Sequence, residues 1–280
     1  MALPALIFFL IVFLYSLCVS CFAITLWLRK RKHSDQVVRE SGQPGKVSIL
    51  IPFRNERKTL PYLVTDLLEQ NYPADCMEIL CINDHSEDGS GILFESLDHA
   101  DKNLRYLDLP EGRQGKKEAL AYGMEHASHS WIIQLDADCR IHPEFVSTHM
   151  DFLERNPSDL VAGLVTLGRR EEGFIEHFER LDQLSLMGVS AASFQLGRAM
   201  MCSGANLAYS RELYDQTRSF DPSAQLASGD DMFLMIGARK LGKVLSFNLE
   251  KYAVVRTSPA GNLKSMLEQR ARWGAKSTRY

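Results

Sequence analysis

The stretch Trp131-Ile132-Ile133-Gln134-Leu135-Asp136-Ala137-Asp138 places two aspartates directly after a short, mostly apolar run. Such a run is typical of a buried parallel strand. Ligands of open α/β sheets bind at the carboxyl ends of the strands, so the two aspartates are expected to face a ligand. Two carboxylates held there are costly without a positive partner, which favours a site for a hard divalent cation. A salt-bridged structural pair is the alternative.

The same pattern recurs on both sides of this stretch. Short apolar runs alternate with segments of helical periodicity, which predicts a doubly wound, mostly parallel α/β sheet flanked by helices. The strands are expected at Val47–Ile51, Glu78–Ile82, Leu104–Leu107, Trp131–Leu135 and Leu160–Leu167. The helices are expected at Lys58–Gln70, after Ser90 to about Ala100, Gly115–Glu125, Pro143–Arg155 and Glu171–Gln195, the last of them amphipathic.

Four further polar residues lie at the ends of predicted strands or the starts of predicted helices. Asp84 follows the second strand, where it would bind a ribose or a base, or form an Asx-turn or helix cap. Lys116 begins a helix, where a donor phosphate would meet both its ammonium and the helix amino terminus; a solvated surface lysine is the alternative. Asp230 and Asp231 precede an apolar helix start and either cap it or, as adjacent carboxylates that raise each other's pKa, supply a base.

One turn of the predicted carboxyl-terminal helix carries Gln269, Arg272 and Trp273 on a shared face. A guanidinium there suits a diphosphate, and an indole suits a sugar ring or packing. A basic amphipathic helix near a membrane is the alternative interpretation.

The length, charge and cysteine content of the chain limit the kinds of protein that it can be. The chain has 280 residues, 45% hydrophobic residues and a formal charge of −3, which indicates a folded α/β domain and excludes a dedicated nucleic-acid binder. Its six cysteines show neither zinc-site spacing nor a disulfide framework.

The amino-terminal run Ala2–Leu28 carries no charge and is long enough to span a bilayer. Trp27 resembles an interface anchor, and Arg29–Lys32 follow at once. The positive-inside rule therefore places the amino terminus outside and the rest of the chain in the cytoplasm, held by a single-pass anchor. A cleaved signal peptide is the competing interpretation.

In order along the chain, the motifs resemble those of the inverting family 2 glycosyltransferases of GT-A fold. Residues 48–56 are similar to the opening strand and P-x-x-N-E loop, residues 83–90 to the D-x-S-x-D-G-S segment, Asp136-Ala137-Asp138 to the D-x-D, and residues 269–273 to the Q-x-x-R-W of membrane-associated members. Such members usually continue into further transmembrane helices, whereas this sequence ends at Tyr280. It is either a piece or truncation of a longer protein or an enzyme that relies on one anchor, and processive synthesis through a channel is not expected of the chain as it stands.

The resemblance implies a role for each matched residue. Pro52, Glu56, Asp84 and Lys116 would surround the nucleotide, Asp136 the ribose or diphosphate, and Asp138 a Mg²⁺ or Mn²⁺ ion. Asp231 would deprotonate the acceptor, and Asp230 stands where the family's base motif has Glu. Ser203–Asn206 resembles the acceptor-side loop, although a tight turn also explains its small residues.

These features lead to one hypothesis of function. The chain is expected to be a membrane-anchored, metal-dependent inverting glycosyltransferase that moves a sugar from a nucleotide-diphosphate sugar to a lipid, lipid-linked or saccharide acceptor. The alternatives are a nucleotidyltransferase and a non-catalytic nucleotide-sugar-binding membrane module. The expected organisation is an anchor with its basic flank (1–32), a linker (33–46), a GT-A domain (47–259) and a basic amphipathic helix (260–280).

Overall fold

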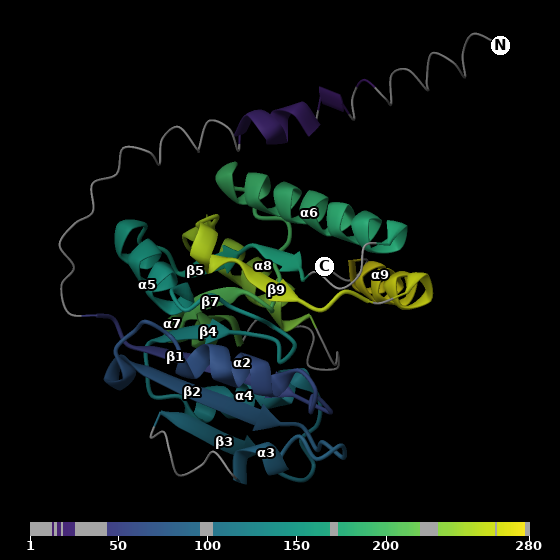
Figure 1. Ribbon diagram of the computed structural model, residues 1–280. Coiled ribbons are helices and arrows are strands. Elements are labelled where there is room, and N and C mark those ends of the chain that lie inside the picture. The colour runs from purple at the N-terminus through teal and green to yellow at the C-terminus, as the bar shows by residue number, and fades with distance from the viewer. Residues whose placement is uncertain are drawn as a thin grey trace.

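The computed structural model describes residues 13, 16–17, 19–25, 44–95, 103–168, 173–218, 229–260 and 262–277. A seven-stranded sheet forms its centre, in the order β3-β2-β1-β4-β7-β5-β8, with helices on both faces (Figure 1). The predicted mostly parallel α/β sheet flanked by helices is therefore confirmed.

The first half of the sheet is parallel and follows the predicted alternation. Its strands are β1 (Val47–Phe53), β2 (Met77–Asn83), β3 (Leu104–Asp108) and β4 (Trp131–Gln134), and its helices are α2 (Leu60–Leu68), η1 (Ala74–Cys76), α3 (Ile92–Glu95) and α4 (Lys116–His126). All seven residues of β1 and all seven of β2 are buried, as expected for strands covered on both faces.

The second half of the sheet contains an antiparallel strand. Here β7 (Leu207–Ser210) runs antiparallel between β4 and β5 (Leu160–Gly163), and β8 (Leu245–Asn248) pairs parallel with β5. The helices of this half are α5 (Phe145–Arg155), α6 (Phe174–Gln195), α7 (Arg211–Arg218), α8 (Asp230–Lys240), η2 (Lys251–Ala253) and α9 (Leu263–Ser277). Because β7 is antiparallel, its amino end lies at the same edge as the carboxyl end of β4.

The prediction of one strand over Leu160–Leu167 is wrong. Two strands occupy it, because β6 (Val165–Leu167) leaves the main sheet and pairs with β9 (Val255–Thr257). The break lies at Leu164, whose carbonyl accepts hydrogen bonds from the Val255 amide and from Asn206 Nδ2. A side chain at Gly163 would overlap the Asn206 side chain, so glycine permits this close approach.

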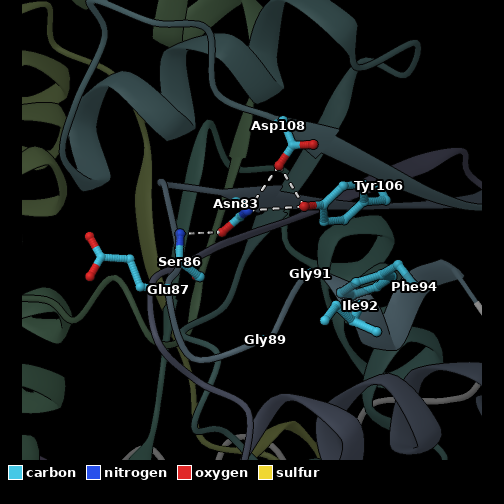
Figure 2. Close-up of a pocket in the computed structure, with 9 residues that line it drawn as sticks. All are labelled: Asn83, Ser86, Glu87, Gly89, Gly91, Ile92, Phe94, Tyr106 and Asp108. Atoms are coloured by element: carbon cyan, nitrogen blue, oxygen red, sulfur yellow. Dashed lines mark hydrogen bonds between the residues drawn. The ribbon is translucent and has the colours of Figure 1, made fainter.

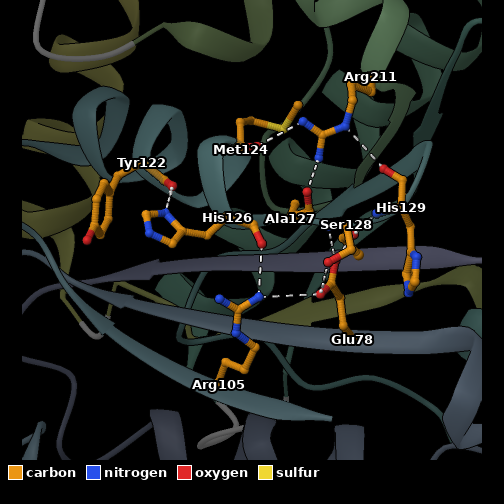
Figure 3. A network of polar contacts seen from close by, with 10 residues as sticks. Glu78, Arg105, Tyr122, Met124, His126, Ala127, Ser128, His129 and Arg211 are labelled. Atoms are coloured by element: carbon orange, nitrogen blue, oxygen red, sulfur yellow. Dashed lines mark hydrogen bonds and ion pairs between the residues drawn. The ribbon is translucent and has the colours of Figure 1, made fainter.

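A polar network ties the two halves together at the edge that carries the amino end of β2 (Figure 3). Buried Glu78 accepts hydrogen bonds from Ser48 Oγ and from the amide and hydroxyl of Ser128. Arg211, the first residue of α7, donates to the carbonyls of Met124, Ala127 and His129 at 2.9, 2.5 and 3.3 Å. The bonds to Met124 and Ala127 satisfy carbonyls that the end of α4 leaves without helical partners.

Most of the predicted membrane span, Ala2–Leu28, lies outside the described residues, as does the linker up to residue 43. In the described ranges, no helix is long and apolar enough to cross a membrane. The five cysteines in these ranges, Cys21, Cys76, Cys81, Cys139 and Cys202, are free thiols.

Candidate functional site

The predicted site residues gather from four elements at one edge of the sheet. Lys116 begins α4, Asp136 follows β4, and Asp231 lies in the first turn of α8. Gly204, in the loop before β7, lies among them: a Cβ on this residue would be 3.3 Å from Lys116 Nζ and 3.5 Å from Asp231 Oδ2. The sheet therefore brings together acids and a cation that are far apart in the sequence.

Lys116 is the positive centre of this group. Its Nζ lies 2.5 Å from Asp136 Oδ1 in an ion pair. Burial acts to lower the pKa of Lys116, but Asp136, Asp230 and Asp231 outweigh it and hold the pKa above its usual value. The ammonium therefore stays charged across the physiological range.

Asp138 lies in a more negative environment. Burial, together with Asp136 and Glu56, raises the pKa of Asp138 to about 6, against a weak hydrogen bond from the Ser258 amide at 3.4 Å. Carboxylates that repel one another in this way are a natural pair of ligands for a divalent cation. Among the described residues, however, no group of three or more His, Cys, Asp and Glu is arranged to hold a metal ion.

Asp84 directly follows β2 and holds the loop that leads into α4. Its Oδ2 accepts a hydrogen bond from the Gly115 amide at 3.0 Å, and Gly115 has a φ of +95° that favours glycine. Its Oδ1 is buried and has no hydrogen-bond partner in the described structure. A buried carboxylate oxygen without a hydrogen-bond partner costs folding free energy. A hydrogen-bond donor on a bound ligand would be its natural partner.

The rest of the 83–90 segment braces the loop after β1. Ser86 Oγ, Asp88 Oδ2 and Ser90 Oγ accept hydrogen bonds from the amides of Asn55, Arg57 and Glu56 at 2.9 to 3.0 Å. Glu56 in turn accepts a hydrogen bond from Thr59 Oγ1, and Pro52 is buried within β1. In this segment, Asp84 is the predicted donor-binding residue, whereas Ser86, Asp88 and Ser90 shape the loop.

Asp231 and Asp230 have separate partners. Asp231 Oδ2 accepts from the Gly204 amide at 2.9 Å and its Oδ1 accepts from the Met232 amide at 2.8 Å. Burial and the neighbouring Asp230 raise the pKa of Asp231 to about 6, although Lys116 and the two amides oppose this. Asp230 Oδ2 accepts from Gln134 Nε2 at 3.0 Å. Asp231 is therefore a carboxylate with a pKa close to neutrality, as a general base requires.

The motifs miss Gln134, and they include Gly204 only as a member of the loop Ser203–Asn206, with no role of its own. Gln134 is 2% exposed, and its only sequence signal is an amide side chain inside an apolar strand. Gly204 acts through its backbone amide and its lack of a side chain, since a Cβ would lie 2.6 Å from Gln134 Nε2. In the same loop, Asn206 Nδ2 donates to the carbonyls of Leu164 and Ala253, so it supports the fold.

The structure describes the predicted carboxyl-terminal residues only in part. Residues 269–273 lie in α9, and Arg270 Nη2 pairs with Asp182 Oδ2 at 2.5 Å. The Gln269 side chain is half-buried, while the side chains of Arg272 and Trp273 lie outside the described structure. Their role in binding a donor stays a prediction.

A separate cavity of about 460 Å³ is lined by residues of β2, of β3 and of the segment between them (Figure 2). Asn83, at the end of that strand, donates from Nδ2 to Tyr106 Oη and to Asp108 Oδ1, both at 2.9 Å. Successive side chains of a strand point to opposite faces, so Asn83 and Asp84 face different sides. The remaining lining residues are Ser86, Glu87, Gly89, Gly91, Ile92 and Phe94. This cavity is distinct from the cluster around Lys116.

Comparison with known proteins gives a consistent picture. The pattern of the family Glycosyl transferase family 2 matches residues 48–218. Glycosyltransferase AglE of Haloferax volcanii is 25% identical over 228 residues, which make up 81% of this chain and 71% of that protein. Poly-beta-1,6-N-acetyl-D-glucosamine synthase of Staphylococcus epidermidis is 28% identical over 168 residues, and the match spans 59% of this chain but only 39% of the synthase.

Solved structures share the fold at low identity. One is mannosyltransferase PcManGT from Pyrobaculum calidifontis, in complex with GDP-Man and Mn²⁺. The match covers 92% of this chain and 74% of the mannosyltransferase chain, with a TM-score of 0.59 and 19% sequence identity. Another is TarS 1-349 of S. aureus, in complex with UDP. The match covers 77% of this chain and 61% of the TarS chain, with a TM-score of 0.57 and 20% sequence identity.

Proposed function

Because the chain belongs to glycosyl transferase family 2, we propose that it moves a sugar from a nucleotide-diphosphate donor to the hydroxyl of a lipid, lipid-linked or saccharide acceptor. The observation that carries this proposal is the convergence of Lys116, Asp136 and Asp231 around Gly204 at one sheet edge. A cation for phosphate thus lies beside a carboxylate suited to take a proton. The structures of similar fold that hold GDP-Man and UDP support a nucleotide-sugar donor.

The donor would lie over the ends of β1, β2 and β4. Asp84 Oδ1 is available to accept a hydrogen bond from the nucleoside, and Lys116 offers its charge at the amino end of α4, where anions are favoured. Asp136 and Asp138 would hold Mg²⁺ or Mn²⁺, which when bound neutralises charge on the departing diphosphate. Pro52, Glu56, Gln269, Arg272 and Trp273 complete the proposed donor side.

The acceptor would be activated by Asp231. Its carboxylate takes the proton of the acceptor hydroxyl, the oxygen attacks the anomeric carbon, and the bond from that carbon to the diphosphate oxygen breaks. This single displacement inverts the anomeric configuration and needs no covalent intermediate on the chain. Gln134 holds Asp230 beside the base, and the Gly204 amide holds Asp231 itself.

The proposed location is the cytoplasmic face of a membrane. Support comes from the charge-free run Ala2–Leu28, followed by the basic residues Arg29–Lys32. A single amino-terminal anchor would keep the domain close to lipid or lipid-linked acceptors.

Turnover of donor sugars tests the proposal. Release of nucleoside diphosphate is measured with a panel of nucleotide sugars, with and without Mn²⁺, for the unchanged chain and for Asp231→Asn. The substitution is expected to lower release by roughly 10² to 10⁴-fold, as loss of a general base does. Asp215→Asn is the matched control, because Asp215 is an exposed aspartate of α7.

Three results would contradict the proposal. Full release by Asp231→Asn would exclude this residue as the base. Donor binding without any release, for every sugar tested, would instead indicate a non-catalytic nucleotide-sugar-binding module. Conversion of the donor and added pyrophosphate to a sugar phosphate and a nucleoside triphosphate would indicate a nucleotidyltransferase.

A further inference from the structure

His85 has a backbone conformation that is uncommon for a residue with a side chain. Its φ is +54°, in the left-handed region that favours glycine, and it follows Asp84 at the end of β2. A histidine in this conformation costs folding free energy that a glycine would not. Backbone strain of this kind is concentrated at functional sites, so the contacts of the His85 side chain indicate its role.

The imidazole of His85 reaches the loop that precedes α4, residues 109–115. Its Nε2 lies 3.0 Å from the carbonyl oxygen of Arg113. A carbonyl oxygen only accepts hydrogen bonds, so Nε2 carries a proton and donates it to this bond. In a straight strand, Asp84 and His85 would point to opposite faces, but the left-handed turn at His85 lets both side chains reach the same loop.

The end of β2 binds this loop at three places. The first residue of the loop, Leu109, donates its amide to the last carbonyl of β2 at 2.9 Å. The last residue, Gly115, donates its amide to Asp84 Oδ2 at 3.0 Å. Between these two ends, His85 binds the carbonyl of Arg113. The contacts of three consecutive residues of the chain therefore fix the start, the middle and the end of the loop.

The middle of the loop depends on the His85 bond. Gly112 has a φ of +87°, and a Cβ placed on it would have no described heavy atom within 4 Å. The side chain of Arg113 turns to α4, where it pairs with Glu118 at 2.8 Å and with Glu125 at 3.0 Å. Among the described hydrogen bonds, the one from His85 is the bond that joins the middle of the loop to the end of β2.

We propose that His85 is a positioning residue for the donor, whose bond to Arg113 holds the loop before α4 in the conformation that binds a nucleoside diphosphate. The loop leads directly into Lys116, and Asp84 has its buried Oδ1 without a described partner. Ordering a loop during binding costs conformational entropy, and a loop that is already ordered avoids this cost. The link to the donor rests on the proposed function, whereas the bond from His85 to the loop does not.

Two substitutions of His85 separate the hydrogen bond from the backbone conformation. His85→Gly removes the imidazole and suits a φ of +54°. His85→Gln keeps an amide nitrogen near the position of Nε2, from which it can donate to the Arg113 carbonyl. The matched control is His177→Gln, because His177 is an exposed histidine of α6 whose Nδ1 bonds the Gly173 carbonyl one turn away.

Titration calorimetry measures the effect on the donor side, with UDP, GDP, ADP, CDP and dTDP as probes, each with Mn²⁺. We expect His85→Gly to weaken binding of the nucleotide that the unchanged chain binds by about 3- to 10-fold, as loss of one hydrogen bond does. Binding by His85→Gln and His177→Gln should stay close to that of the unchanged chain. The Tm of His85→Gly should not fall, because relief of the left-handed strain offsets the freedom that glycine gives the unfolded chain.

Hydrogen exchange tests the His85 bond without any nucleotide. Mass spectrometry follows the exchange of the backbone amides of residues 110–117 in the ligand-free full chains. We expect this exchange to be several-fold faster in His85→Gly than in the unchanged chain, because the loop opens more often when its middle is released. Exchange in His85→Gln and in His177→Gln should match the unchanged chain.

The proposal fails in any of three cases. Equal exchange in all four chains would show that His85 does not hold the loop. Unchanged nucleotide affinity in His85→Gly, with or without a lower Tm, would show that donor binding does not use the bond. An equal loss of affinity in His85→Gln would show that the imidazole acts by another contact. By contrast, the expected exchange in a chain that binds none of the five nucleotides would support the His85 bond and contradict the proposed function alone.

Discussion

Three aspartates and one lysine have separate roles in the proposed sugar transfer. Lys116 is paired with Asp136 on the donor side, while Asp231 is held by two backbone amides and has Asp230 as its neighbour. Asp230 does not need to touch the acceptor to matter. Its negative charge raises the pKa of Asp231, and its bond from Gln134 fixes where that charge lies.

The pH dependence of activity tests this division of roles. A base must be ionised, so the rate should fall as pH drops through the pKa of Asp231, at about 6. Asp230→Asn removes the like charge that raises this pKa, so the acid limb of kcat/KM should move to lower pH. The measurement is a pH profile of nucleoside diphosphate release for both chains. An acid limb that stays in place would show that Asp230 does not influence the base.

At the scale of elements, Arg211 joins the antiparallel strand to the parallel half of the sheet. It follows β7 directly and donates to the carbonyls of Met124 and Ala127, at the end of the helix α4 that begins with Lys116, and to that of His129 in the loop that follows (Figure 3). The contact therefore lies at the opposite end of α4 from the site. Its contribution should be to stability rather than to chemistry.

Thermal unfolding tests the role of Arg211. Arg211→Ala leaves these carbonyls without their donor, which should cost about 1 to 3 kcal/mol and lower Tm by several degrees. Arg218→Ala, an exposed arginine of α7, serves as the control and should leave Tm nearly unchanged. Equal Tm values for the two variants would show that the α4 contact contributes nothing.

At the scale of the whole molecule, the sequence predicts the parallel half of the fold better than the rest. The runs that form β1 and β2 are apolar throughout their centres, and a strand buried on both faces requires such a run. By contrast, β7 and β8 are only four residues long and include serine, tyrosine or asparagine. Pairing with distant strands decides their place, and no local pattern reports it.

The sequence likewise predicts some features of the candidate site and misses others. Acids at strand ends are visible in the sequence, so Asp84, Asp136 and Asp231 can be named from motifs. The contact of Gly204 with Asp231 is made by a backbone amide, which every residue except proline carries. The sequence also shows that α6 is amphipathic, but tertiary contacts of Glu179 and Asp182 decide that its apolar side faces outward.

The stereochemistry of donor cleavage tests the central claim, a single displacement assisted by Asp231. The donor is an α-linked nucleotide sugar, water replaces the acceptor, and NMR identifies the anomer that forms first. Attack from the face opposite the diphosphate predicts the β-anomer, with Asp231→Asn slowing its formation. The α-anomer as first product would show retention and contradict the account.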